Sequence, residues 1–282
     1  MFRQPNRFPS TNSRPMTNPR KKPTKQTKLG DLPDWNLDDL YPGPDSRELK
    51  WDLENAETRC VAFEADFKGK LAGLAAGSEA GKALGAAVKR YEALDDTLGR
   101  VISYASLRYA GNTSDPAIAK FYGDMQERIT AASLHLLFFA LELNRIDDDK
   151  LDAAMADPAL GHYRPWIEDV RKEKPYQLED RVEALFHEKS VTGYSAWNRN
   201  YDETIASLRF RIGGQSLPIE PALNLLQDAD GKKRKAAAQA LGKTFKENLR
   251  PFTLVTNTLA KDKEISARWR GFKDVADAPH LA

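Results

Sequence analysis

His187-Glu188 is the first place in this sequence where residue types suggest chemistry, because some zinc sites are built on a helix that carries H-E-x-x-H. In that motif two histidines four positions apart share one helical face, since a helix has about 3.6 residues per turn. Val191 stands four residues after His187, so the second imidazole is missing. Without a bound metal, Glu188 has no activated water from which to take a proton. The pair therefore predicts no metal site.

We interpret the stretch around this pair as the end of an amphipathic helix. On this interpretation Leu185 and Phe186 point inward, and the solvent-facing residues are Glu183, His187, Glu188 and Lys189. The other histidines, His135, His162 and His280, are too scattered to suggest a ligand set. Cys60 is the single cysteine, which excludes an intramolecular disulfide and a thiolate metal cluster and fits a reducing cytoplasm.

A second motif fragment, Gly242-Lys243-Thr244, matches the end of a phosphate-binding loop. Such a loop needs a glycine five residues earlier, where its backbone wraps the phosphate, and Ala237 stands there. The preceding residues form a helix-favouring run rather than a strand. Phosphate binding is therefore not predicted, and no Ser-His-Asp set can be assigned.

The charge distribution separates a short tail from the rest of the chain. Residues 1–30 hold eight Lys or Arg, five prolines and no Asp or Glu, whereas residues 31–282 hold 35 basic and 41 acidic residues. A tail of this composition cannot bury enough apolar surface to offset its ordering entropy, so we predict that residues 1–30 are disordered. Contact with nucleic acid or a membrane surface stays open for the tail. No apolar run reaches the ~18 residues that span a bilayer, and we expect neither a membrane nor a nucleic-acid partner for the chain as a whole.

Apolar periodicity predicts a bundle of long helices over about residues 45–146. One helix starts near Asp45-Ser46, and its buried positions are Leu49, Leu53, Ala56, Cys60 and Phe63. The next long helix carries Val88, Tyr91, Leu94, Leu98, Val101 or Ile102, Ala105 and Tyr109. After Gly111-Asn112, Asp115 can cap a further helix with Pro116 in its first turn. That helix continues the pattern through Ile118, Tyr122, Met125, Ile129, Ala132, Leu136, Phe139 and Leu143. These facing stripes predict two antiparallel helices.

Shorter helices are expected over about residues 147–207, followed by one β-hairpin at about 208–219 and further helices to the end. The hairpin is indicated by alternating Leu208, Phe210 and Ile212, the turn residues Gly213-Gly214, and then Leu217 and Ile219. The predicted fold class is all-α with one small β-hairpin.

Five stretches resemble the N-terminal half of the oligoendopeptidase F family of zinc peptidases. They are LPDWNLDDLYPG (32–43), RVISYASLRYAGNTSDP (100–116), YSAWNRNYDETIASLRFRIGG (194–214), DADGKKRKAAAQAL (228–241) and TLAKDKEISARWRGF (258–272). The resemblance implies a mostly helical, cytosolic enzyme that hydrolyses short peptides with one zinc ion. In that family the H-E-x-x-H helix and a glutamate ligand lie in the C-terminal half.

No position of this sequence matches the family's zinc motif, so no catalytic or metal-binding residue is carried over. The resemblance extends as far as Ala282, and we expect residues 31–282 to be the helical lobe without its catalytic zinc domain. Its implied partners are the C-terminal half and short peptides, and we predict that the chain alone is inactive. Gly213 and Gly214 are candidates for lining the substrate channel. The alternative is a stand-alone helical protein-interaction module with an apolar face.

Overall fold

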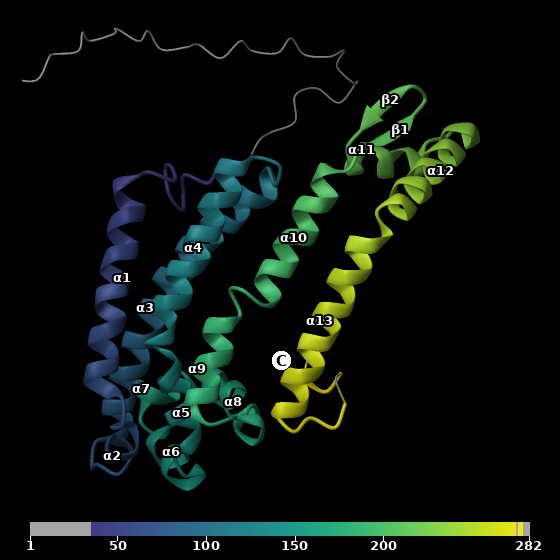
Figure 1. The fold of residues 1–282 in the computed structure, drawn as a ribbon. Coiled ribbons are helices and arrows are strands. Elements are labelled where there is room, and N and C mark those ends of the chain that lie inside the picture. The colour runs from purple at the N-terminus through teal and green to yellow at the C-terminus, as the bar shows by residue number, and fades with distance from the viewer. Residues whose placement is uncertain (1–34, 275, 279–282) are drawn as a thin grey trace, which may run out of the picture. The chain divides into compact units, whose positions relative to one another are not determined.

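The computed structural model describes residues 35–274 and 276–278 (Figure 1). The predicted tail at residues 1–30 and His280 lie outside this range. In chain order the helices are α1 (Arg47–Phe67), α2 (Leu71–Ala75), α3 (Ala80–Gly111), α4 (Pro116–Leu134), α5 (Leu137–Arg145), α6 (Asp148–Ala154), α7 (Pro158–Gly161), α8 (Arg164–Lys172), α9 (Asp180–Lys189), α10 (Tyr194–Ser207), α11 (Ile219–Asn224), α12 (Gly231–Glu247) and α13 (Leu249–Trp269). Two 3-10 turns, η1 (Lys174–Tyr176) and η2 (Leu225–Gln227), and two strands, β1 (Phe210–Ile212) and β2 (Gln215–Leu217), complete the described elements. The predicted all-α fold with one small hairpin is confirmed.

The helix starts follow from side chains that satisfy free backbone N–H groups. Ser46 accepts a hydrogen bond from Leu49 N–H at the start of α1. Asp115 accepts from Ala117 N–H at 2.8 Å at the start of α4, where Pro116 has no N–H to satisfy. Both starts agree with the sequence prediction.

Helix α3 packs against both α1 and α4, and the contact with α4 is the one that the facing stripes predicted (Figure 1). The stripe residues are buried over most of its length, from Val88 and Leu94 to Tyr109. Tyr109 stacks on Tyr122 of α4, with ring centroids 4.8 Å apart. Burial of these stripes is the main stabilising contribution of the bundle, at about 1.5–3 kcal/mol for each large apolar side chain.

The stripe from Ile118 to Leu143 belongs to two helices rather than to the single helix that we predicted. Helix α4 ends at Leu134, and α5 begins at Leu137 after a turn at His135 and Leu136. In this turn Leu136 N–H donates to Ser133 O at 2.9 Å, a bond over three residues instead of four. The tighter winding rotates the following helix, so the adjacent rings of Phe138 and Phe139 are both buried.

A further small core lies under the hairpin. Strands β1 and β2 pair antiparallel, with Ile212 opposite Gln215, and Gly213 and Gly214 form the turn between them. Their φ angles of 57° and 80° fit the two-residue turn that matches strand twist and that glycine adopts without steric cost. The core beneath consists of Leu208, Phe210, Ile212, Ala222, Ala237 and Leu241. The hairpin prediction is confirmed, while the predicted domain boundaries stay predictions.

Candidate functional site

A cleft in the described part of the chain holds two adjoining cavities of about 650 and 320 Å³. Helices α4, α9 and α13 contribute most of the lining of the larger cavity, and α5, η1 and the end of α13 line the smaller one. Residues from both sides of the cleft line both cavities: Leu137, Glu173, Glu183, Ser266 and Arg270.

Glu183 and Arg270 form a two-pronged ion pair at the boundary between the cavities. Arg270 Nη1 and Nη2 donate to the two carboxylate oxygens of Glu183 at 2.6 and 2.7 Å. Glu183 is 7% exposed, and it also accepts a hydrogen bond from Leu178 N–H at 2.9 Å. Our prediction that Glu183 faces solvent is therefore wrong. A partner 87 residues away compensates the buried charge.

The helix orientation around this pair also differs from the sequence interpretation. Leu185, which we placed inward, is 53% exposed, whereas Phe186 is half-buried as predicted. Glu188 and Lys189 are exposed, in agreement with the prediction, but His187 is half-buried. The face that carries Glu183, Phe186 and His187 is turned inward, because polar partners of Glu183 and His187 lie on that side.

The end of α13 positions Arg270 through a backbone motif that its sequence encodes. Gly271 N–H donates to Arg268 O at 3.2 Å, and Phe272 N–H donates to Ala267 O at 3.0 Å. This pattern requires a residue with positive φ directly after the helix cap, and Gly271 has a φ of 77°. Phe272 then stacks on Tyr176 with ring centroids 3.9 Å apart, which fixes the helix end against η1. The R-G-F sequence was the available signal for this site, and our sequence analysis did not use it.

Burial and pairing act in opposite directions on the titration of Glu183. Burial by itself would raise the pKa of this carboxyl, but the hydrogen bonds from Arg270 and from Leu178 N–H outweigh it, so the pKa lies below the ordinary value. The hydrogen bonds that Arg270 donates to Glu183 raise the pKa of Arg270. Both groups are therefore charged at neutral pH.

His187 contacts a hydroxyl group, but the geometry opposes a nucleophile–base pair. Its Nε2 lies 2.9 Å from Ser133 Oγ and 3.1 Å from Thr130 O. Ser133 Oγ–H itself donates to Thr130 O at 3.2 Å. A carbonyl oxygen only accepts, so its contact with the ring is a hydrogen bond when Nε2 carries the proton. With Nε2 protonated, His187 cannot take a proton from Ser133 through that atom, and this arrangement is structural.

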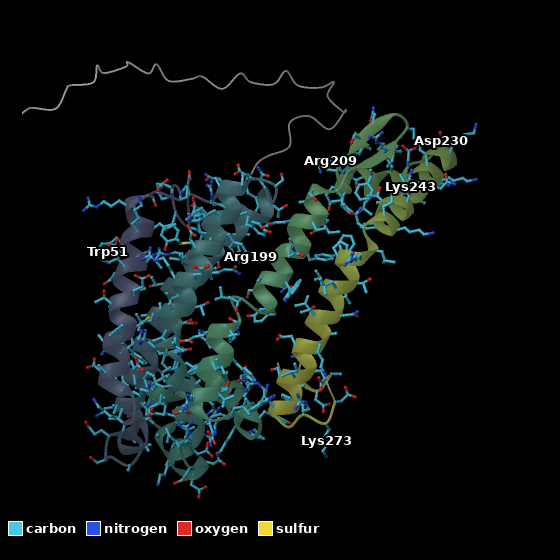
Figure 2. All side chains as sticks on the ribbon, viewed as in Figure 1. Trp51, Arg199, Arg209, Asp230, Lys243 and Lys273 are labelled. Carbon is cyan, nitrogen blue, oxygen red and sulfur yellow. The ribbon has the colours of Figure 1, made fainter. Side chains whose placement is uncertain are left out.

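The other candidates from the sequence do not assemble into a site. Gly242-Lys243-Thr244 lies inside α12, with Lys243 pointing outward, so no phosphate loop forms there (Figure 2). Cys60 is fully buried in the helical core, and burial raises the pKa of its thiol to about 11. Gly213 and Gly214 form the hairpin turn, and the lining residues of the two cavities come from other segments.

The described residues offer no grouping of side chains for a metal ion. Across residues 35–274 and 276–278, no three His, Cys, Asp or Glu side chains form a group that could hold a metal ion. His187 is engaged by Ser133 and Thr130, and His135 Nδ1 lies 2.5 Å from Glu64 Oε2. The residues described here therefore do not fit a zinc ion. Within the same residues no single helix is long and apolar enough to cross a membrane, although the bent combination of Pro116–Arg145 with Asp148–Ala154 passes that test by length and composition.

Comparisons with known proteins agree on one group. Residues 142–210 match the family model described as Oligopeptidase F. The chain is 24% identical over 275 residues to Oligopeptidase PepF of Bacillus subtilis (strain 168), an alignment that covers 90% of this chain and 39% of the relative. The crystal structure of oligoendopeptidase-F from Enterococcus faecium superposes with a TM-score of 0.69 at 18% identity, covering 86% of this chain and 46% of that one. This chain thus spans about two-fifths of the length of the curated relative that it matches.

The helical fold is shared with the oligoendopeptidase-F crystal structure, and the sequence matches lie in the same group of proteins. More narrowly, these matches support a resemblance to the N-terminal part of oligoendopeptidase F. The resemblance found in the sequence is confirmed.

Proposed function

We propose that this chain forms one wall of the substrate channel in a cytoplasmic, zinc-dependent oligoendopeptidase that cleaves short peptides. The observation that carries this proposal is the cleft between α4, α9 and α13. Its larger cavity, of about 650 Å³, falls within the ~300–1,000 Å³ typical of ligand pockets. The match to Oligopeptidase PepF gives the proposal its reaction class.

The lining of the larger cavity suits an extended peptide. Apolar side chains such as Ile129, Phe186 and Ile265 can cover the apolar side chains of a peptide. Hydroxyl groups from Thr130, Ser133 and Ser190 lie among them and can exchange hydrogen bonds with a peptide backbone. A folded protein cannot insert its packed backbone into a hollow of this size, so the selected substrates are short and unstructured.

In this proposal, the catalytic groups lie outside the described residues. They contain no group fit for zinc, so the metal and the general base belong to the C-terminal part found in longer family members. The present chain contributes the positioning of the substrate. Holding a peptide in a reactive geometry can lower a barrier by several kcal/mol. Gly213 and Gly214 line neither cavity, so the proposed place of their rigid turn is a part of the channel beyond this cleft.

Three samples test the proposal: residues 1–282, the C-terminal part of a family member, and the two joined in one chain. A quenched octapeptide reports cleavage. We expect no turnover from residues 1–282, weak turnover from the C-terminal part, and strong, chelator-sensitive turnover from the joined protein. Chelator-sensitive turnover by residues 1–282 alone would refute the division of labour.

A cleft variant and a surface variant refine this test. Ile265→Glu places a carboxylate in the cleft, whereas Leu254→Glu changes a residue on the same helix that is 56% exposed. The first should reduce turnover of the joined protein, and the second should not. Equal activity of both variants would mean that the cleft is not the channel. Full activity of the C-terminal part alone would favour the alternative of an interaction module, which would use exposed apolar residues of α13 such as Leu249 and Trp269.

A further inference from the structure

The two cavities of the cleft share five lining residues. The larger cavity lies toward α4 and α9, and the smaller one toward α5 and η1. Of the five residues that line both, Glu183 and Arg270 bond to each other across the cleft. Glu183 belongs to α9, and Arg270 caps α13.

We infer that the Glu183–Arg270 pair is a gate that divides one cleft into two chambers, and that its opening lets an extended peptide pass from one chamber into the other. This inference rests on the proposed function and deepens it, because it assigns control of peptide length to two named side chains.

The closed state is held firmly from both sides. The pair has two short charge-assisted hydrogen bonds, which are roughly twice as strong as neutral ones. Leu178 N–H holds the Glu183 carboxylate, and Tyr176 O accepts a further bond from Arg270 Nη1 at 3.3 Å. The contact of Phe272 with Tyr176 keeps the end of α13 in place.

Arg270 is the partner that can move. Its side chain is 27% exposed, against 8% for the side chain of Glu183. An arginine side chain has several rotatable bonds, and its guanidinium donates to any carbonyl or carboxylate oxygen in reach. A peptide in the cleft offers backbone carbonyl oxygens that can replace Glu183 as acceptors. The occupant that fits this exchange is thus an extended peptide long enough to reach both chambers.

The test replaces the whole pair, because removing one partner would leave a buried charge uncompensated. The variant is Glu183→Leu with Arg270→Leu, which makes the boundary apolar and removes the crossing hydrogen bonds. The matched control is Glu264→Leu with Arg268→Leu. This second ion pair lies on the same helix and is exposed, and neither residue lines the two cavities.

Fluorescence anisotropy with residues 1–282 measures binding of a labelled pentapeptide and a labelled decapeptide of alternating alanine and serine. In the gate variant we expect the preference for the decapeptide to rise about tenfold, because the longer peptide no longer has to break the ion pair, a saving of ~1.4 kcal/mol. The control should keep the wild-type preference. An unchanged preference in a gate variant with wild-type circular dichroism would overturn the inference.

A second measurement needs no ligand and separates the two proposals. In the gate variant, backbone hydrogen exchange should become faster at residues 176–183 and at residues 265–272, because the pair joins these segments. Arg270→Lys should show a smaller change at both segments. If no peptide binds to any variant, the proposed function fails. The hydrogen-exchange rates alone then test whether the pair holds the two segments together. Unchanged exchange at both segments would then refute a gate.

Discussion

Replacement of Leu136 by aspartate tests how the long helices meet. Leu136 is 4% exposed and belongs to the largest apolar core, where the turn between α4 and α5 places it. Removing its apolar contacts costs about 1.5–3 kcal/mol, and an unpaired buried carboxylate costs several kcal/mol more. The total is comparable with the ~5–15 kcal/mol by which domains are stable, so we expect Leu136→Asp to prevent folding.

Milder changes give a graded series. Leu136→Ala should fold and lose about 2–5 kcal/mol through the cavity it creates. Ile129→Asp should lose less than Leu136→Asp, because Ile129 is half-buried and lines the cleft, where water can reach the carboxylate. Lys120→Ala should change stability by at most about 0.5 kcal/mol, since its ion pair with Asp124 is exposed. Urea unfolding followed at 222 nm measures the series. Equal, small effects at all three positions would refute the assigned packing.

Three further predictions use other parts of the chain. Gly213→Ala should destabilise the hairpin by about 1–2 kcal/mol because φ is positive there. Gly242→Ala, at an uncrowded position inside α12, should stabilise the fold by about 0.5–1 kcal/mol. Urea unfolding measures both changes, and effects of the same sign would contradict the turn assignment. The pairing of Glu183 should stabilise the fold at pH values above the ordinary carboxyl pKa of 4.5. This contribution should disappear as the pH falls through the lowered pKa of the folded state. The difference in unfolding free energy between the wild type and Glu183→Gln should therefore shrink toward pH 3. A constant difference from pH 6 to pH 3 would exclude that linkage. Cys60, fully buried and with a pKa raised to about 11, should react with a thiol reagent only as fast as the protein opens, and rapid labelling under native conditions would count against its place in the core.

Local patterns in the sequence specify much of this fold. Asp115-Pro116 marks a helix start because the carboxylate and the proline ring both suit the first turn, whatever lies nearby. Gly213-Gly214 predicts the hairpin because few other residues adopt positive φ at two successive positions. The stripes of α3 and α4 are long enough for the helical period to identify their buried faces.

Long-range pairing decides what these patterns leave open. Helix α9 has too few apolar residues for its period to choose a face, and the contact of Glu183 with Arg270 turns inward a carboxylate that its composition places in solvent. The turn at His135-Leu136 likewise depends on the packing of neighbouring helices, since the apolar stripe runs through it without interruption. The cleft exists only where α13 returns beside α4 and α9, so its lining joins residues that are far apart in the sequence. The sequence by itself determined the family resemblance, most of the helices and the hairpin, because those signals are local or run along the chain. The tertiary structure alone decided the buried ion pair and the cleft, because a charge becomes stable inside a protein only when folding brings its partner to it.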